Sequence, residues 1–86
     1  MGTRPRTKPE HLSRKLLAVR RYLGLSQSEM NARLGCQVST ARISEYEHGV
    51  REPPLTVLLA YARTARVNVE LLIDDQKELP ERFKQN

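Results

Sequence analysis

The sequence predicts a small all-α domain of five helices. Apolar residues recur every three or four positions through most of the chain, which is the period of an α-helix. No segment keeps the alternation of a β-strand for long, and residues that start or stop helices separate the apolar stretches. The length of 86 residues, of which 38% are hydrophobic, suits one domain with a single modest core.

Two helices are predicted in the first half of the chain, and the apolar stripe of the first comprises Leu12, Leu16, Val19 and Leu23. Gly24 follows this stripe and suits the left-handed position that ends many helices. Ser26 and Glu29 then have the spacing of a capping box, which predicts the start of the second helix. The inward residues of this short helix are Met30 and Leu34. It is expected to end near Gly35.

A third helix is predicted between Ser39, as its cap, and Gly49, as its stop signal. Ile43 and Tyr46 lie three positions apart within it, so both face the core.

The last two helices follow the adjacent prolines at positions 53 and 54, which prevent helix before them and suit a helix start. The stripe predicted for the fourth helix comprises Leu55, Leu58, Leu59 and Ala62. Asn68 is predicted to cap the fifth helix through its side chain. The residues expected in that helix are Leu71, Leu72 and Ile73.

The charge of the chain favours a polyanionic partner. Fifteen Lys and Arg residues stand against ten Asp and Glu residues, which gives a net charge of +5. Residues 1–23 alone carry seven basic residues and one acidic residue, so the excess is concentrated at the N-terminal end. Nucleic acid and acidic membrane surfaces are both polyanions that such a chain attracts.

Composition also divides the chain into three parts. Residues 1–9 contain two prolines and three basic residues, and are predicted to form a flexible basic arm. Residues 10–73 are predicted to form the folded domain. Residues 74–86 are expected to be a C-terminal tail that is either mobile or weakly docked, with Leu79 and Phe83 as its large apolar groups.

Several classes of protein are excluded by missing motifs. The single cysteine, Cys36, cannot form an internal disulfide, and the two histidines offer no recurrent zinc-ligand spacing. The sequence has no HExxH, CxxC or glycine-rich phosphate loop, so we expect no enzyme activity, metal or cofactor. It also has no long apolar stretch and no secretory signal, so we expect a cytoplasmic protein without membrane association.

Three ordered motifs resemble a known family. They are residues 25–30 (LSQSEM), 43–49 (ISEYEHG) and 53–55 (PPL). Together they resemble the helix-turn-helix domain of phage repressors and Cro proteins, the XRE family, over roughly residues 12–73. This resemblance implies a five-helix lambda-repressor-like fold whose third helix lies in the DNA major groove.

The resemblance and the residue chemistry together suggest base contacts on the third helix. Ile43 and Tyr46 face the core, so the opposite face carries the positions that match the family's base readers: Thr40, Ala41, Ser44 and Glu45. Hydroxyl groups can donate or accept at base edges, a methyl group can touch thymine, and a carboxylate can accept from cytosine.

Phosphate contacts are predicted around the same helices, and the candidates are Gln27, Ser39, Arg42, His48 and Arg51. Gln27 stands in the first turn of the second helix, where free N–H groups already attract an anion. Arg42 can reach a phosphate or a guanine edge, or it can be solvated or paired with Glu45 three residues away, and these readings stay open. In the N-terminal arm, Arg4, Arg6 and Lys8 can follow an adjacent groove or simply aid solubility.

Arg20 and Glu47 match the positions where the family places an ion pair between the first and third helices. A planar guanidinium suits that bidentate geometry, so we predict that this pair forms. The chain also departs from the family pattern. It has two extra residues between Gly35 and Ile43, which predicts an enlarged turn, and Asn31 and Arg66 replace residues that are usually alanine and glycine.

These observations predict a sequence-specific transcriptional regulator of double-stranded DNA, a repressor acting as a homodimer. The competing prediction is an antitoxin or another protein-interaction module with the same fold, which binds a toxin protein as its partner. Such a role asks for an added apolar segment, and the candidate is Leu79 with Phe83. That pair can instead cover a second subunit or fold back onto the core.

Overall fold

A computed structural model describes residues 9–84 of the chain. This part contains no strand, and its elements are α1 (Leu12–Leu23), α2 (Gln27–Leu34), α3 (Thr40–Glu47), α4 (Leu55–Ala65), α5 (Glu70–Ile73) and a short 3-10 helix, η1 (Glu81–Lys84). The predicted all-α class with five α-helices is therefore confirmed for the described residues. The basic side chains Arg4, Arg6 and Lys8 lie outside them.

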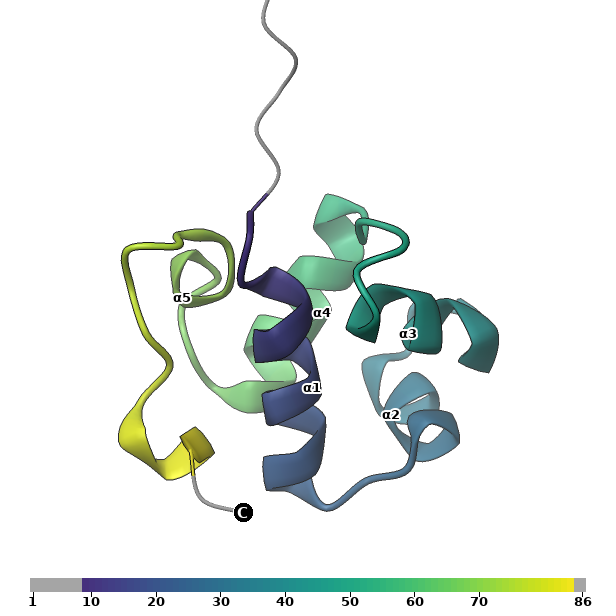
Figure 1. Cartoon of the computed structure of the whole chain (residues 1–86). Coiled ribbons are helices and arrows are strands. Elements are labelled where there is room, and N and C mark those ends of the chain that lie inside the picture. The colour runs from purple at the N-terminus through teal and green to yellow at the C-terminus, as the bar shows by residue number, and fades with distance from the viewer. Residues whose placement is uncertain (1–8, 85–86) are drawn as a thin grey trace, which may run out of the picture.

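Helix α1 is the central element of the fold. In Figure 1 it lies between α2 and α3 on one side and α5 with the C-terminal segment on the other. It contacts α3, α4, α5 and η1. Its residues Leu16 and Val19 are fully buried, as are Met30 of α2 and Ile43 of α3. The core thus joins the elements on both sides of α1.

The predicted helix boundaries agree with the local geometry. Gly24 and Gly35 follow α1 and α2 with φ angles of 71° and 67°, the left-handed conformation that glycine adopts without strain. Ser26 and Glu29 form the complete capping box at the start of α2. Ser39 accepts a hydrogen bond from the backbone N–H three residues later and so caps α3.

The predicted apolar stripe of α4 is partly wrong. Leu55 is 80% exposed and Leu59 is also exposed, whereas Leu58 and Ala62 are buried as expected. The remaining buried residues of this helix are Val57, Tyr61 and Ala65. Because α4 is apolar almost all round, the spacing of its residues did not define which side faces the core.

The start of α5 also differs from the prediction. The helix begins at Glu70 after Val69, without a side-chain cap. Asn68 contributes its backbone carbonyl, which accepts from the N–H of Leu71 at 3.0 Å. Leu72 is fully buried, whereas Ile73 is exposed. A helix of four residues cannot bury every apolar side chain that it carries.

The C-terminal segment is docked on α1 as far as residue 84. Leu79 and Phe83 are both buried, and η1 contacts α1. The ring of Phe83 packs against Tyr22 with centroids 4.6 Å apart, and the Arg82 guanidinium lies 4.6 Å from the centroid of Phe83. Residues 74–84, which the sequence left as either mobile or weakly docked, thus pack against the domain through their two large apolar side chains.

A buried lysine fastens this segment to α1. The Lys15 side chain is almost completely buried, although it carries a charged group. Its Nζ donates to the backbone carbonyls of Leu71 at 2.8 Å, Asp74 at 3.0 Å and Lys77 at 2.7 Å. Burial lowers the pKa of Lys15, and nearby carboxylates oppose that effect. Lys15 therefore caps the end of α5 from α1.

An aspartate makes the reciprocal contact. The carboxylate of Asp75 accepts from the backbone N–H groups of Glu10 at 2.8 Å and His11 at 3.1 Å, just before α1. The hydrogen bond from Glu10 is the main reason that the pKa of Asp75 lies below its ordinary value. The start of α1 and the segment after α5 thus each satisfy polar backbone groups of the other.

Candidate nucleic-acid interface

The turn between α2 and α3 contains the segment where the sequence predicted two extra residues. It spans residues 35–39, and Gln37 adopts a left-handed conformation with φ of 59°. Cys36 is half-buried and packs against the core together with Val38. The turn is therefore anchored at two points, and it sets how α3 projects from α2.

Helix α3 presents a polar surface opposite its buried side chains. Ile43 and Tyr46 lie in the core, whereas Thr40 and Ala41 are exposed. Ser44 and Glu45 are half-buried. In Figure 1, α3 lies at one side of the molecule, next to α2. The four predicted base-reading residues therefore share the surface of one peripheral helix.

His48, predicted to contact phosphate, folds back on the end of α3. Its Nδ1 lies 2.8 Å from the carbonyl oxygen of Ser44 and 3.3 Å from the hydroxyl of the same residue. The carbonyl contact requires Nδ1 to carry the hydrogen, which leaves Nε2 as the ring's other polar atom. The histidine and the serine are thus one hydrogen-bonded unit.

Glu45 and two predicted phosphate-binding arginines come together. The Nε of Arg51 donates to Oε1 of Glu45 at 2.9 Å. The Nη1 of Arg42 lies 3.7 Å from the same oxygen. The alternative pairing of Arg42 with Glu45 is therefore present, with Arg51 as the closer partner.

Gln27 is the first residue of α2, but its amide is partly engaged. Its Nε2 donates to Oε1 of Glu47 at 3.0 Å. An amide nitrogen carries two hydrogens, so one remains for another acceptor. The predicted phosphate-binding side chain is thus held by the end of α3.

The predicted ion pair between Arg20 and Glu47 is present and bidentate. The Nε of Arg20 donates to Oε2 at 2.6 Å and its Nη2 donates to Oε1 at 3.0 Å, while Nη1 donates to the carbonyl of Leu25 at 2.9 Å. The side chain of Arg20 is 18% exposed and that of Glu47 is 3% exposed. The hydrogen bond to Glu47 raises the pKa of Arg20. This pair links α1, α3 and, through Gln27, α2.

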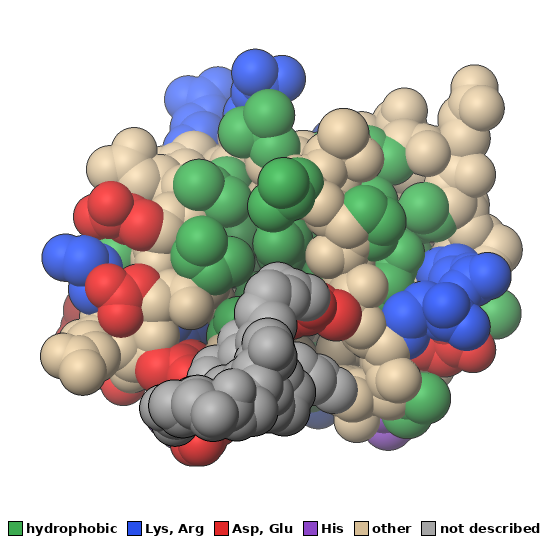
Figure 2. Space-filling view, turned by 90° about the horizontal axis from the view of Figure 1, so that it is seen from above, with side chains coloured by type: hydrophobic (Ala, Val, Ile, Leu, Met, Phe, Trp, Pro, Cys, Tyr) green, Lys and Arg blue, Asp and Glu red, His purple; other side chains and the backbone are tan. Residues whose placement is uncertain are grey.

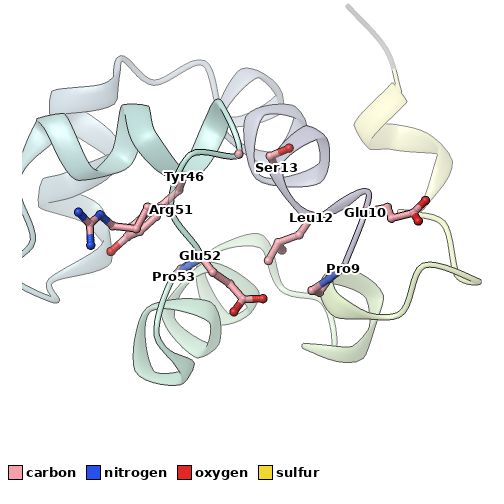
Figure 3. A pocket seen from close by; sticks show the side chains of 9 residues that line it. Pro9, Glu10, Leu12, Ser13, Tyr46, Arg51, Glu52 and Pro53 are labelled. Atoms are coloured by element: carbon pink, nitrogen blue, oxygen red, sulfur yellow. The ribbon is translucent and has the colours of Figure 1, made fainter. Parts of the chain in front are cut away.

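A pocket of about 330 Å³ lies between the start of α1 and the loop after α3. Figure 3 shows Pro9 and Leu12 on one side of it and Arg51, Glu52 and Pro53 on the other. The Arg51 side chain extends away from Pro9 and Leu12. The guanidinium therefore stands on the α3 side of this pocket.

Neither metal-ligating nor membrane-spanning features are found in residues 9–84. No group of three or more His, Cys, Asp or Glu side chains in this range is placed to hold a metal ion. No helix in the same range is long and apolar enough to span a bilayer.

The family model described as helix-turn-helix matches residues 16–72, and the chain belongs to that family. The family and the fold are those of DNA-binding transcriptional regulators rather than enzymes. The resemblance to XRE-type domains inferred from the motifs is confirmed. This match includes α2, the turn after it and α3.

Two known proteins are similar to the chain. An uncharacterized HTH-type transcriptional regulator, y4dL, of Sinorhizobium fredii (strain NBRC 101917 / NGR234) is 34% identical over 73 residues, which are 85% of this chain. The chain spans about a third of that relative's length, since the match covers 35% of it. The crystal structure of the P22 c2 repressor in complex with synthetic operator 9T is similar with a TM-score of 0.67 and 25% identity. That match covers 74% of this chain and 94% of the repressor chain.

The sequence did not predict the roles of two residues, Lys15 and Asp75. Lys15 lies three positions after Leu12 and four before Val19, so it stands within the apolar stripe of α1. A lysine at such a position indicates that its side chain is buried and that its ammonium group donates to acceptors inside the protein. Asp75 gave no comparable signal, because its partners lie 64 and 65 residues earlier in the chain.

Proposed function

We propose that this chain is a sequence-specific transcriptional regulator that binds double-stranded DNA with α3 in the major groove. One observation carries the proposal: α3 keeps its large apolar side chains in the core and its small polar ones at the surface. The P22 c2 repressor, which shares the fold, has a structure in complex with a synthetic operator. A protein bound to a promoter in this way blocks transcription without catalysing a reaction, so we propose that the chain is a repressor.

Base contacts are assigned to three side chains of α3 whose groups fit base edges: Thr40, Ala41 and Ser44. Thr40 and Ser44 offer hydroxyl groups, and Ala41 offers a methyl group for thymine. Glu45 is not in this set, since Arg51 and Arg42 share one of its carboxylate oxygens.

Phosphate contacts are assigned around this surface. The candidates are Gln27, Ser39, Arg42, His48 and Arg51. Ser39 and Gln27 stand at the starts of α3 and α2, where backbone N–H groups and the helix dipole favour an anion. The arm residues Arg4, Arg6 and Lys8 are proposed to follow an adjacent groove.

A selection from random duplexes at fixed salt tests the proposal. A recovered inverted repeat is the expected result, because a two-fold dimer reads two half-sites about 34 Å apart. If each complex contacts six to ten phosphates, affinity for the recovered site falls by about 10³ to 10⁵ between 50 and 200 mM salt. Failure to enrich any sequence would contradict sequence-specific binding.

The homodimer in this proposal is supported by an exposed apolar surface. Figure 2 shows hydrophobic side chains gathered on the face where α4 begins. Leu55 and Ile73 are exposed and line one groove together with Pro53 and Pro54. Sedimentation equilibrium of the wild type and of Leu55→Asp, each bound to its DNA site, tests this surface. The wild type is expected to bind as a dimer that Leu55→Asp dissociates, and a wild-type monomer on the DNA would contradict the proposal.

A toxin partner lacks comparable support. The apolar pair predicted for that role, Leu79 and Phe83, is buried against the body of the domain. We therefore assign this pair to the fold and keep DNA as the proposed partner. The cytoplasm, where a regulator meets DNA, is the proposed location.

A further inference from the structure

Glu45 holds the loop that follows α3 through three contacts. Its backbone carbonyl accepts from the N–H groups of Val50 at 3.0 Å and Arg51 at 3.4 Å. Its carboxylate accepts from Arg51 Nε at 2.9 Å. A single residue of α3 thus fixes both the backbone and the side chain of Arg51.

The contact leaves the anion-binding edge of Arg51 available. A guanidinium has five N–H donors in a planar fork, and Nε supplies only one of them to Glu45. The two Nη groups form the opposite edge, which matches a phosphate bidentately. The Arg51 side chain is 51% exposed, so this edge can be reached from outside the protein.

The same contact makes Glu45 a poor base reader. Its Oε1 receives Arg51 and lies 3.7 Å from Arg42, so the carboxylate is already compensated by two cations. Turning it toward a cytosine amino group would release Arg51 beside the DNA. A carboxylate without its arginine would also be repelled by the phosphates.

We propose that Glu45 is a positioning residue: it holds Arg51 through Nε so that the two Nη groups bind one DNA phosphate, and it reads no base. The proposal rests on the proposed function, which is DNA binding. Its chemical consequence is that Glu45 contributes to affinity for every duplex. It does not set the preference at any one base pair.

A double-mutant cycle tests this role. Wild type, Glu45→Ala, Arg51→Ala and the double variant are titrated with the selected site and with an unrelated duplex at several salt concentrations. Glu45→Ala and Arg51→Ala are each expected to lower affinity about tenfold on both duplexes, as for loss of a charge-assisted contact. The double variant binds no more weakly than Arg51→Ala, and the salt slope falls by about 1 with Arg51→Ala.

Two further variants serve as controls. Glu45→Gln keeps an oxygen that accepts from Nε, so it is expected to recover most of the affinity lost in Glu45→Ala. Arg63→Ala removes another exposed arginine, on α4 rather than in the loop after α3, and is expected to leave binding unchanged. Circular dichroism of each variant verifies that it is folded.

Other outcomes overturn the assignment. If Glu45→Ala changes preference at one base pair and leaves the unrelated duplex unaffected, Glu45 is a base reader. If the losses of the single variants multiply in the double variant, the two residues act independently. Higher affinity of Glu45→Ala on both duplexes would mean that Glu45 only repels DNA. If the wild type binds neither duplex, the proposed function itself is contradicted, whatever the variants do.

Discussion

Two glutamates of α3, two positions apart, each bind an arginine in very different surroundings. Glu47 is 3% exposed and is held by Arg20 and Gln27, from α1 and α2. Glu45 is 39% exposed and is held by Arg51, from the loop after the helix. Both pairs join a guanidinium to a carboxylate, but burial differs, and burial determines what removal of a partner costs.

Because of this difference in burial, one pair on α3 contributes mainly to stability and the other mainly to DNA recognition. Removing a partner from the inner pair leaves a charge stranded among buried side chains, which is costly. Removing a partner from the outer pair leaves a charge that water solvates, which costs little. We therefore expect substitutions at the inner pair to destabilise the domain and those at the outer pair to weaken DNA binding.

The largest effect is expected from Arg20→Ala. It strands the buried Glu47 carboxylate, so the free energy of unfolding should fall by about 3 kcal/mol. Urea denaturation measures the loss. The matched control is Arg21→Ala, at the exposed neighbouring position, which should change stability by less than about 0.5 kcal/mol. Equal effects of both substitutions would contradict the buried role of the pair.

Lys15→Met should produce the next largest effect, a loss of about 2 kcal/mol. Methionine fills a similar volume but donates to none of the three carbonyls that Lys15 now satisfies. The comparison is with Lys77→Met, whose side chain is half exposed and whose ion pair with Glu70 is long at 3.7 Å. A Lys15→Met variant as stable as the wild type would show that water satisfies those carbonyls.

Asp75 should make stability depend on acidity. The folded-state pKa of Asp75 lies below its ordinary value of 3.8, so the folded protein binds fewer protons than the unfolded chain. Its contribution is present above about pH 4 and is lost as the pH falls through the folded pKa. Urea midpoints measured from pH 5 to pH 2 should decline less steeply for Asp75→Asn than for the wild type. Identical slopes would mean that the hydrogen bonds to Asp75 do not stabilise its carboxylate relative to the protonated acid.

The smallest change in stability is expected from Glu45→Ala. Both side chains of its ion pair with Arg51 are substantially exposed, so the free energy of unfolding should change by less than about 1 kcal/mol. Its thermal midpoint should therefore stay close to that of the wild type while DNA affinity falls. A loss as large as that of Arg20→Ala would remove the distinction between the two glutamates.

Local signals predicted much of this fold. Gly24 and the capping pair Ser26 and Glu29 act within a few residues of themselves, so their roles follow from spacing alone. The ion pair of Arg20 and Glu47 joins distant residues, and only the family resemblance placed it. The helix ends predicted from spacing and the ion pair predicted from the resemblance both agree with the structure. Neither prediction required the path of a loop to be known.

The features that escaped prediction depend on segments far apart in the chain or on ambiguous spacing. The place of Lys15 in the apolar stripe of α1 indicated burial, but its partners are carbonyls 56 to 62 residues later, which α1 alone could not identify. The sequence of α4 is apolar on most sides, so its spacing did not determine which side faces the core. Leu55 was therefore wrongly predicted to be buried. Glu45 meets Arg51 across the end of a helix, and that contact requires the path of the loop to be known.

The most direct measurement of the central claim is a change in the selected DNA sequence. Ala41→Gln and Thr40→Gln place a side chain that prefers adenine at exposed positions of α3. Duplex selection with each variant should recover the wild-type motif altered at one base pair per half-site, while Arg63→Gln on α4 leaves it unaltered. An unchanged motif with both α3 variants would contradict the placement of this helix in the major groove.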